Sequence, residues 1–492
     1  MNLLITHHHL GPGGVTKVIA NHVLALDAAS DGPMRVGLIY DGNDTGWPTL
    51  PPLQNVEVIR LPVPTVGYSD AVDGRPVADA MLAAIAAASF NDAPMHVHNH
   101  SLGKSVAFSC AVRELAERAW PLLLHCHDFA EDYRPAGYRR LADALGGRLS
   151  ATLYSHAPQV HFAALNGRDV AALANAGIPR DRLHFLPNPV PAMPQLPGRR
   201  ASRQKLRERL GVPEGAGYWL YPVRGIRRKN VGEVCLLAAA ARGRVVPAVT
   251  LAPANPKERP FYEFWRSLAL ELDLPVQFGA GESGGLTFME NLAAADRVLT
   301  ASVAEGFGMV FLESWLAGKS LVGRDLPEIT ADFKAAGLDL SGLTPRIDVP
   351  YQLVAEGYPG RLHDAATQIS QDYGREPPSR SAIDASVAGR VMTGRIDFGD
   401  LDEELQSRVI REVATDTALA DDTFSQWHRG EVDVSDNAAV VRDEYDLITT
   451  GRRLISLYRL LADTSADDVT AADGEQLLDE FQSIDRLRLI RT

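Results

Sequence analysis

Residues 95–126 read MHVHNHSLGKSVAFSCAVRELAERAWPLLLHC and contain the repeating unit of the fold. The apolar runs at 95–99 and 121–126 have the length of strands, and 104–119 between them has the apolar spacing of an amphipathic helix. Two strands joined by a crossover helix predict a parallel pair. Both runs are almost continuously hydrophobic, as parallel strands covered on both faces are.

The same alternation extends in both directions along the chain. In the first half we expect further strands at 2–6, 35–40, 56–61, 151–155, 161–166 and 183–188, and further helices at 15–26, 78–88 and 169–177. The proline-rich stretch PNPVPAMPQLPG (187–198) predicts a linker. A second series follows it, with a basic helix at 201–211 and strands at 218–223, 247–252, 275–279, 297–301 and 320–324. We therefore expect two doubly wound Rossmann-like α/β domains, 1–190 and 191–350, which face a cleft where ligands bind.

The last part of the chain has a different character. Residues 351–492 lose the alternation and contain acidic helical segments at 400–414, 443–462 and 474–487. We expect a mostly helical acidic C-terminal extension. The 492 residues carry a net charge of −13, and this segment, with 15 basic and 28 acidic residues, accounts for that excess. Residues 191–350 hold 20 basic and 17 acidic residues, so they remain able to attract phosphate groups, whereas the overall balance argues against nucleic acid as a partner.

The spacing of the cysteines and the N-terminal sequence indicate the cellular compartment of the protein. The three cysteines are widely spaced, which predicts neither a disulfide framework nor a thiolate metal site. The N-terminus has no basic segment before its short apolar run, and no apolar stretch approaches the ~20 residues that span a bilayer. We expect a cytoplasmic protein without a transmembrane segment.

The segment AEGFGMVFLESWLAGKS (304–320) carries the most chemical information. It places Glu305 and Glu313 on either side of Gly306, Phe307 and Gly308. A helix that starts near Gly308 offers unpaired N–H groups to an anion such as a diphosphate, while the carboxylates suit hydroxyl groups. This combination describes a nucleotide sugar. The alternative is a glycine turn before an amphipathic helix with solvated glutamates.

Two further segments have residues suited to phosphate. In YPVRGIRRKN (221–230), four cations follow a strand; Arg224 and Lys229 are the better candidates, whereas Arg227 and Arg228 are equally well explained as solvated loop charges. The segment HHHLGPGGV (7–15) lacks the GxGxxG spacing of a dinucleotide site. Its glycine pair allows a ligand close to the backbone or simply forms a tight turn.

Histidines gather in the first half of the chain. Eight of them form three clusters, His7–His9, His96/His98/His100 and His125/His127, each at the end of an expected strand. Imidazoles two residues apart on a strand face the same side, so a metal-dependent hydrolase is an alternative function. No HExxH occurs, and strand-end histidines bonded to the backbone explain most of them. We single out His127 as a ligand contact.

Five segments in order resemble a known family: PGGVTKVI (12–19), LLLHCHD (122–128), GIPRDRLHFLPNPV (177–190), VRGIRRKN (223–230) and EGFGMVFLE (305–313). Together they resemble the retaining GT-B glycosyltransferases of family 4, whose Glu-x7-Glu motif the last segment matches. The resemblance implies a metal-independent enzyme without a cofactor that moves a hexosyl group from a nucleotide-diphosphate sugar to a hydroxyl acceptor. It also implies that some part of 440–490 crosses back to the N-terminal domain.

The resemblance assigns roles by position. Its expected catalytic residues are His127, Arg224, Lys229 and Glu305, and its expected donor-binding residues are Gly13, Gly14, Gly306, Phe307, Gly308, Met309 and Glu313. Val223 stands where the family usually has glycine. Arg134, Arg139 and Arg140 permit a negatively charged acceptor. A non-catalytic sugar-nucleotide binding protein is a further alternative.

Overall fold

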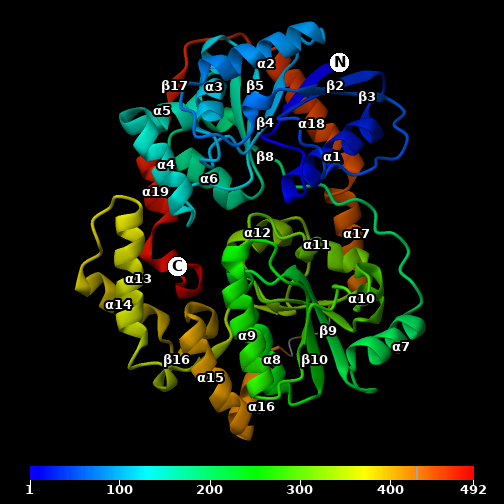
Figure 1. Ribbon diagram of the computed structural model, residues 1–492, viewed down its shortest axis with the longest axis vertical. Helices are drawn as coiled ribbons and strands as arrows, with labels where there is room; N and C mark the ends of the chain where they lie inside the picture. The colour runs from blue at the N-terminus through cyan, green and yellow to red at the C-terminus, as the bar shows by residue number, and fades with distance from the viewer. Residues whose placement is uncertain (428–429, 431) are drawn as a thin grey trace. The chain divides into compact units, whose positions relative to one another are not determined.

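The computed structural model describes residues 1–427, 430 and 432–492, which form two compact units. The first comprises Met1–Pro191, Asp372–Gly374 and Arg442–Ser483; the second comprises Ala192–Gln371, Arg375–Val441 and Ile484–Thr492. Residues 351–492 are therefore divided between the two units and do not form a third one (Figure 1).

The first unit is built on a seven-stranded sheet of order β3-β2-β1-β4-β5-β7-β8, in which every neighbouring pair is parallel. Its strands are β1 Asn2–Thr6, β2 Met34–Tyr40, β3 Val56–Pro62, β4 Met95–His98, β5 Leu122–Cys126, β7 Val160–Ala164 and β8 Leu183–Phe185. Chain order reverses between β1 and β4, so the carboxyl ends of these strands form a topological switch point, where such sheets bind ligands.

Helices cover both faces of this sheet. They are α1 Gly14–Ala29, α2 Arg75–Ala87, α3 Val106–Glu117, α4 Pro135–Leu145, α5 Leu149–Leu153, α6 Gly167–Asn175, α18 Leu447–Ala462 and α19 Gly474–Phe481, with 3-10 turns η1 Pro64–Val66, η2 Gly146–Arg148 and η3 Arg180–Arg182. The C-terminal helix α18 packs along α1 (Figure 1). Its Leu454 and Tyr458 are fully buried in the same core cluster as Val23 and Leu26 of α1.

The predicted strand at 151–155 is wrong. Most of it belongs to α5, and only β6 Ser155–His156 pairs, antiparallel, with β17 Thr470–Ala471. A five-residue apolar run fits a buried turn of helix as well as a strand, so hydrophobicity alone did not distinguish them.

The second unit has a six-stranded parallel sheet of order β11-β10-β9-β12-β13-β14. Its strands are β9 Gly217–Arg224, β10 Val245–Leu251, β11 Gln277–Phe278, β12 Arg297–Thr300, β13 Leu321–Arg324 and β14 Leu343–Thr344, and β15 Asp348–Pro350 pairs separately with β16 Arg395–Asp397. The strands β9 and β12 are neighbours, so the loops that follow them lie together at one edge.

The helices between residues 192 and 445 belong to the second unit, apart from the last residues of α13 and α17. They are α7 Arg199–Leu210, α8 Val231–Ala241, α9 Arg259–Glu271, α10 Phe288–Ala294, α11 Val310–Leu316, α12 Pro327–Ala335, α13 Tyr358–Asp372, α14 Arg380–Arg390, α15 Glu403–Thr415, α16 Thr417–Ser425 and α17 Val434–Glu444, with the 3-10 turns η4 Arg227–Lys229, η5 Pro256–Glu258, η6 Tyr351–Leu353, η7 Phe398–Asp400, η8 Ile484–Arg486 and η9 Leu489–Arg491. Every residue of α8 is buried, because α15 and α16 pack against it (Figure 1). Among the described residues, no helix has the length and hydrophobicity that crossing a bilayer requires.

Candidate functional site

Glu305 is the centre of a polar cluster in the second unit. It lies in the loop between β12 and α11, and its side chain is 6% exposed. Its Oε1 accepts hydrogen bonds from Ser302 Oγ at 2.6 Å and from Lys229 Nζ. Its Oε2 accepts one from Arg228 Nη1 at 2.7 Å. The carboxylate therefore faces two cations that come from η4, just after β9.

The two cations determine the protonation state of Glu305. Burial acts to raise the pKa of its carboxyl, but the charges of Lys229 and Arg228 outweigh burial and lower that pKa to about 2. At Lys229, burial outweighs the attraction of Glu305. Burial therefore lowers the pKa of Lys229, although the charge of Glu305 acts to raise it. The Tyr221 hydroxyl lies 2.6 Å from Ser302 Oγ, and burial raises its pKa. The cluster thus presents an ionised carboxylate at neutral pH.

Arg224 and Arg227 have different surroundings. The exposed Arg224 donates a long hydrogen bond, 3.4 Å, from Nη1 to Ala252 O. Arg227 donates from Nε and Nη2 to both carboxylate oxygens of Glu403, at 2.6 and 2.9 Å, and its guanidinium lies 4.1 Å from the centre of the Phe261 ring. Arg227 therefore holds the C-terminal segment in place, whereas the guanidinium of Arg224 faces solvent.

Arg228 is bonded within the polar cluster and is not a solvated loop charge. Besides its contact with Glu305, it donates to Ala304 O at 2.8 Å, and its own carbonyl accepts from Val303 N at 3.0 Å. These bonds join η4 to the loop after β12. The sequence spacing could not distinguish Arg228 from Arg227, because their partners, Glu305 and Glu403, are far away in the sequence.

The loop before α11 has a glycine with a definite role. Gly308 has a φ of +83°, and a Cβ on it would lie 2.6 Å from the Phe311 ring, so both the backbone and the packing require glycine. The helix begins at Val310, two residues later than predicted, and Glu313 lies in its first turn, partly buried.

The other predicted residues of this loop differ in exposure. Phe307 is buried, and its ring packs edge-on against Phe333 at 5.4 Å between centroids. Gly306 and Met309 are partly exposed. The Phe307 ring is therefore part of the packed interior, whereas Gly306 and Met309 are accessible to a ligand.

Gly13 and Gly14 lie at the start of α1 in the first unit, and both are exposed. The backbone of Gly13 is extended, with a φ of 179°. A Cβ on Gly13 would meet one atom at 4.0 Å, and one on Gly14 would meet none within 4 Å. Neither packing within the unit nor backbone conformation requires glycine here, so the space beside the pair is open.

Five histidines meet in the interior of the first unit beside its switch point: His22 of α1, His96 and His98 of β4, His125 of β5, and His127 just after β5. His96 Nε2 and His125 Nδ1 share a hydrogen bond of 3.0 Å, and His98 Nδ1 and His127 Nε2 share one of 2.7 Å. The His22 ring stacks on that of His96, with 5.4 Å between centroids. We call these five residues the histidine cluster.

Burial keeps the histidine cluster neutral. It lowers the pKa of His22 and His127 to about 3, and it lowers the pKa of His96, His98 and His125 well below the ordinary value. His127 is therefore a neutral hydrogen-bonding group at physiological pH.

The other histidines of the three sequence clusters behave mostly as expected for strand ends. His7 Nδ1, His8 Nδ1 and His100 Nε2 bond the backbone carbonyls of His98, Val66 and Leu153. Within the part of the chain that the structure describes, the groups spaced for a metal ion lie in the histidine cluster. In the triads His22/His96/His98 and His98/His125/His127, one nitrogen per residue lies within 4.8 Å of the others.

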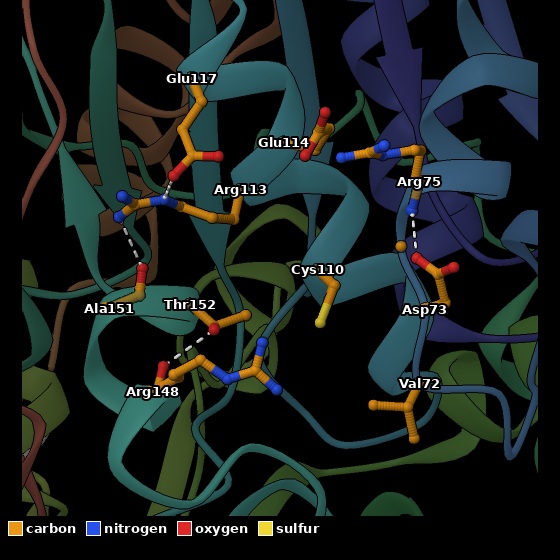
Figure 2. Close-up of a pocket in the computed structure, with 11 residues that line it drawn as sticks. Val72, Asp73, Arg75, Cys110, Arg113, Glu114, Glu117, Arg148, Ala151 and Thr152 are labelled. Carbon is orange, nitrogen blue, oxygen red and sulfur yellow. Dashed lines mark hydrogen bonds and ion pairs between the residues drawn. The ribbon is translucent and has the colours of Figure 1, made fainter.

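Among the described residues, the first unit has at least two cavities. One of about 270 Å³ lies at the N-terminus of α4, where Lys104, Arg134 and Arg140 line it. The other, of about 580 Å³, lies among α2, α3 and α5, and Figure 2 shows the ion pair of Arg113 with Glu117 and the hydrogen bond from Arg75 N to Asp73. Its lining charges balance: Arg75, Arg113 and Arg148 against Asp73, Glu114 and Glu117. None of the predicted catalytic or donor-binding residues lines either cavity, whereas Arg134 and Arg140, which the sequence offered for a negatively charged acceptor, line the smaller one.

No family model matches the chain. A curated protein, the mannosylglucosyl-3-phosphoglycerate synthase of Petrotoga mobilis, is 27% identical over 356 residues, which cover 68% of this chain. The chain spans 66% of that relative's length, slightly less than two thirds.

Solved structures resemble the chain over most of its length. The sucrose-phosphate synthase of Thermosynechococcus elongatus has a TM-score of 0.52 at 14% identity and covers 94% of this chain and 99% of its own. A glycosyltransferase of Rickettsia africae has the same TM-score and coverage at 13% identity. The expected fold class is thereby confirmed: this is a GT-B fold with two Rossmann-like domains. The resemblance to GT-B glycosyltransferases is confirmed with it.

Proposed function

We propose that the protein is a glycosyltransferase that moves a hexosyl group from a nucleotide-diphosphate sugar to a hydroxyl acceptor, with retention of configuration and without a metal ion. The observation that carries the proposal is the ionised Glu305, held by Lys229 and Arg228 within a Glu-x7-Glu segment of a GT-B fold. The name of the curated relative, a synthase of a sugar conjugate, supports transfer of a sugar.

The charges of the cluster suit the donor. Arg224, Arg228 and Lys229 carry three positive charges against one on Glu305, and the excess attracts a diphosphate. As the bond to the sugar breaks, these cations stabilise the charge that develops on the leaving group, and they take the place of Mg²⁺. Arg224, whose guanidinium is exposed, is the cation best able to move onto the phosphate.

Glu305 and Glu313 are assigned to hydroxyl groups. A carboxylate has about four lone-pair positions, and Glu305 uses three of them for Ser302, Lys229 and Arg228. The remaining one accepts a hydroxyl of the donor sugar. Glu313, in the first turn of α11, accepts the ribose hydroxyls, and the backbone from Gly306 to Met309 lies against sugar and phosphate.

The first unit contributes groups of a different kind. The open space beside Gly13 and Gly14 lets the donor diphosphate approach the backbone. His127 binds a sugar hydroxyl as a neutral imidazole. Retention follows if the departing phosphate deprotonates the acceptor on the same face of the sugar, so no protein base is required.

The acceptor carries an anionic group in this proposal. Lys104, Arg134 and Arg140 line the 270 Å³ cavity at the N-terminus of α4, and the positive end of the helix dipole adds to their charge. Asp128 partners Arg134 at 2.6 Å, whereas Lys104 forms no ion pair with a described residue. The name of the curated relative, which contains phosphoglycerate, supports a phosphorylated or carboxylated acceptor.

The test is a transfer assay with UDP-, GDP- and ADP-sugars against sugar phosphates, phosphoglycerate conjugates and their neutral counterparts, with EDTA in parallel reactions. We expect transfer from one donor class to an anionic acceptor, undiminished by EDTA, and an anomeric proton coupling in the product that matches the donor. Glu263→Gln, an exposed carboxylate on α9, is the control for Glu305→Gln. Undiminished transfer by Glu305→Gln refutes the assignment of the site.

A further inference from the structure

We propose that His22, His96 and His98 bind a transition-metal ion with a preference for imidazole, such as Zn²⁺, inside the first unit. The inference concerns the histidine cluster alone and does not depend on the proposed transferase activity. A metal in this position stabilises the unit and takes no part in the proposed sugar transfer.

The geometry of the three residues is the first support. They come from two elements, α1 and β4, and one ring nitrogen from each lies within 4.8 Å of the others. A tetrahedral Zn²⁺ with bonds of about 2.0–2.1 Å separates its nitrogen ligands by about 3.4 Å. The nitrogens therefore need to approach one another by at most about 1.4 Å, which is within the reach of side-chain rotation.

Unpaired nitrogens are the second and independent support. All three side chains are fully buried. Neither ring nitrogen of His22 has a hydrogen-bond partner among the described residues, and Nε2 of His98 has none either. Buried polar atoms are nearly always paired, and an unpaired one loses the hydrogen bond that it made to water in the unfolded chain. One metal ion supplies a partner to one nitrogen of His22 and to Nε2 of His98 at the same time.

Hydrogen bonds around the site orient two of the rings as ligands. His98 Nδ1 is bound to His127 Nε2, which leaves the unpaired Nε2 of His98 for a metal. His96 Nδ1 is bound to the Tyr458 hydroxyl at 2.8 Å, so its Nε2 becomes the ligand when it releases His125. Partners of this kind, which hold the second nitrogen of a metal-bound histidine, are typical of metal sites.

The ligand set selects the class of ion. Three imidazoles suit Zn²⁺, Ni²⁺, Co²⁺ and Cu²⁺, whereas Mg²⁺ and Ca²⁺ require oxygen ligands. Because the rings are fully buried, we expect the ion to enter as the chain folds.

The experiment measures metal in protein that folded with metal present. The full-length chain is expressed in medium with Zn²⁺ or Co²⁺, purified without metal-affinity resin, and examined by elemental analysis and visible absorption. We expect about one ion per chain, the absorption bands of tetrahedral Co²⁺, and no retention of Mg²⁺.

Two variants separate this site from adventitious binding. His22→Leu removes a side chain without hydrogen bonds, so it is expected to fold, to lose the metal and to keep the melting temperature of metal-free wild-type protein. His9→Gln alters a partly exposed histidine outside the cluster and is expected to keep the metal. Refolding with Zn²⁺ should raise the melting temperature of wild type and His9→Gln only.

Three results overturn the proposal: wild-type protein without retained metal, His22→Leu with as much metal as wild type, or loss of the metal in His9→Gln. The melting temperature of metal-free His22→Leu shows separately that the variant is folded, so a loss of metal cannot be ascribed to unfolding.

Discussion

Replacing Glu305 by glutamine keeps the shape of the side chain and removes its charge. In the folded protein, the pKa of Glu305 is lowered from 4.5 to about 2 by Lys229 and Arg228 against the effect of burial. At about 1.4 kcal/mol per pKa unit, the ionised carboxylate contributes about 3 kcal/mol to stability. Because the folded pKa is depressed, this contribution is complete above pH 4.5 and is lost as the pH falls through 2; about half of it is left at pH 3.

The assay is urea unfolding followed by circular dichroism at pH 7 and at pH 3, together with sugar transfer at pH 7. We expect Glu305→Gln to lose about 3 kcal/mol at pH 7 and about half as much at pH 3, with transfer reduced at least about 100-fold. Glu263→Gln breaks an exposed pair with Arg266 and should change stability by less than about 0.5 kcal/mol. A loss for Glu305→Gln that is equal at the two pH values contradicts the role of its charge, and transfer within tenfold of wild type contradicts its role in catalysis.

Four further predictions concern charges and glycines. Arg224→Ala should raise the donor KM about tenfold or more, equivalent to about 1.4 kcal/mol, without changing the melting temperature, because the side chain is exposed. Gly14→Ala should leave stability equal or raise it by up to about 1 kcal/mol, yet raise the donor KM, since the methyl group enters space left for the ligand. Gly308→Ala should lose about 1–3 kcal/mol in urea unfolding, owing to its positive φ. The double variant Lys104→Ala/Arg140→Ala should raise the KM of an anionic acceptor and not that of a neutral one, and equal effects on both would refute the assignment of the cavity.

The strands were predictable where burial on both faces makes the sequence continuously apolar. The strand β4, the helix α3 and the strand β5 follow the expected pattern from residue 95 to residue 126. The prediction failed at 151–155, because α5 is a single buried turn and carries the same composition as a strand. The packing of α18 on α1 could not be predicted from local sequence spacing, because it is a contact between segments more than 400 residues apart.

The polar cluster around Glu305 was predictable in part. Lys229 and Glu305 are 76 residues apart, and the parallel topology places the loops after β9 and β12 at one edge, so their meeting follows from the fold. The fold alone does not predict that Arg227 and Arg228 pair with different carboxylates. Glu403, in the C-terminal segment, binds Arg227 and leaves Arg228 to face Glu305.

The acidic C-terminal segment acts as a counter-charge for the second unit. Its Glu403, Asp421 and Asp397 pair with Arg227, Arg244 and Arg324, which precede it in the basic part of the chain. Among the described residues it forms no ion pair with Arg224 or Lys229. The segment therefore neutralises arginines that hold the fold and leaves the positive charge of the second unit beside Glu305. This pairing accounts for part of the uneven charge along the sequence, because carboxylates near the end of the chain pair with arginines of the second unit. The cations that we propose to bind phosphate are not neutralised by these carboxylates.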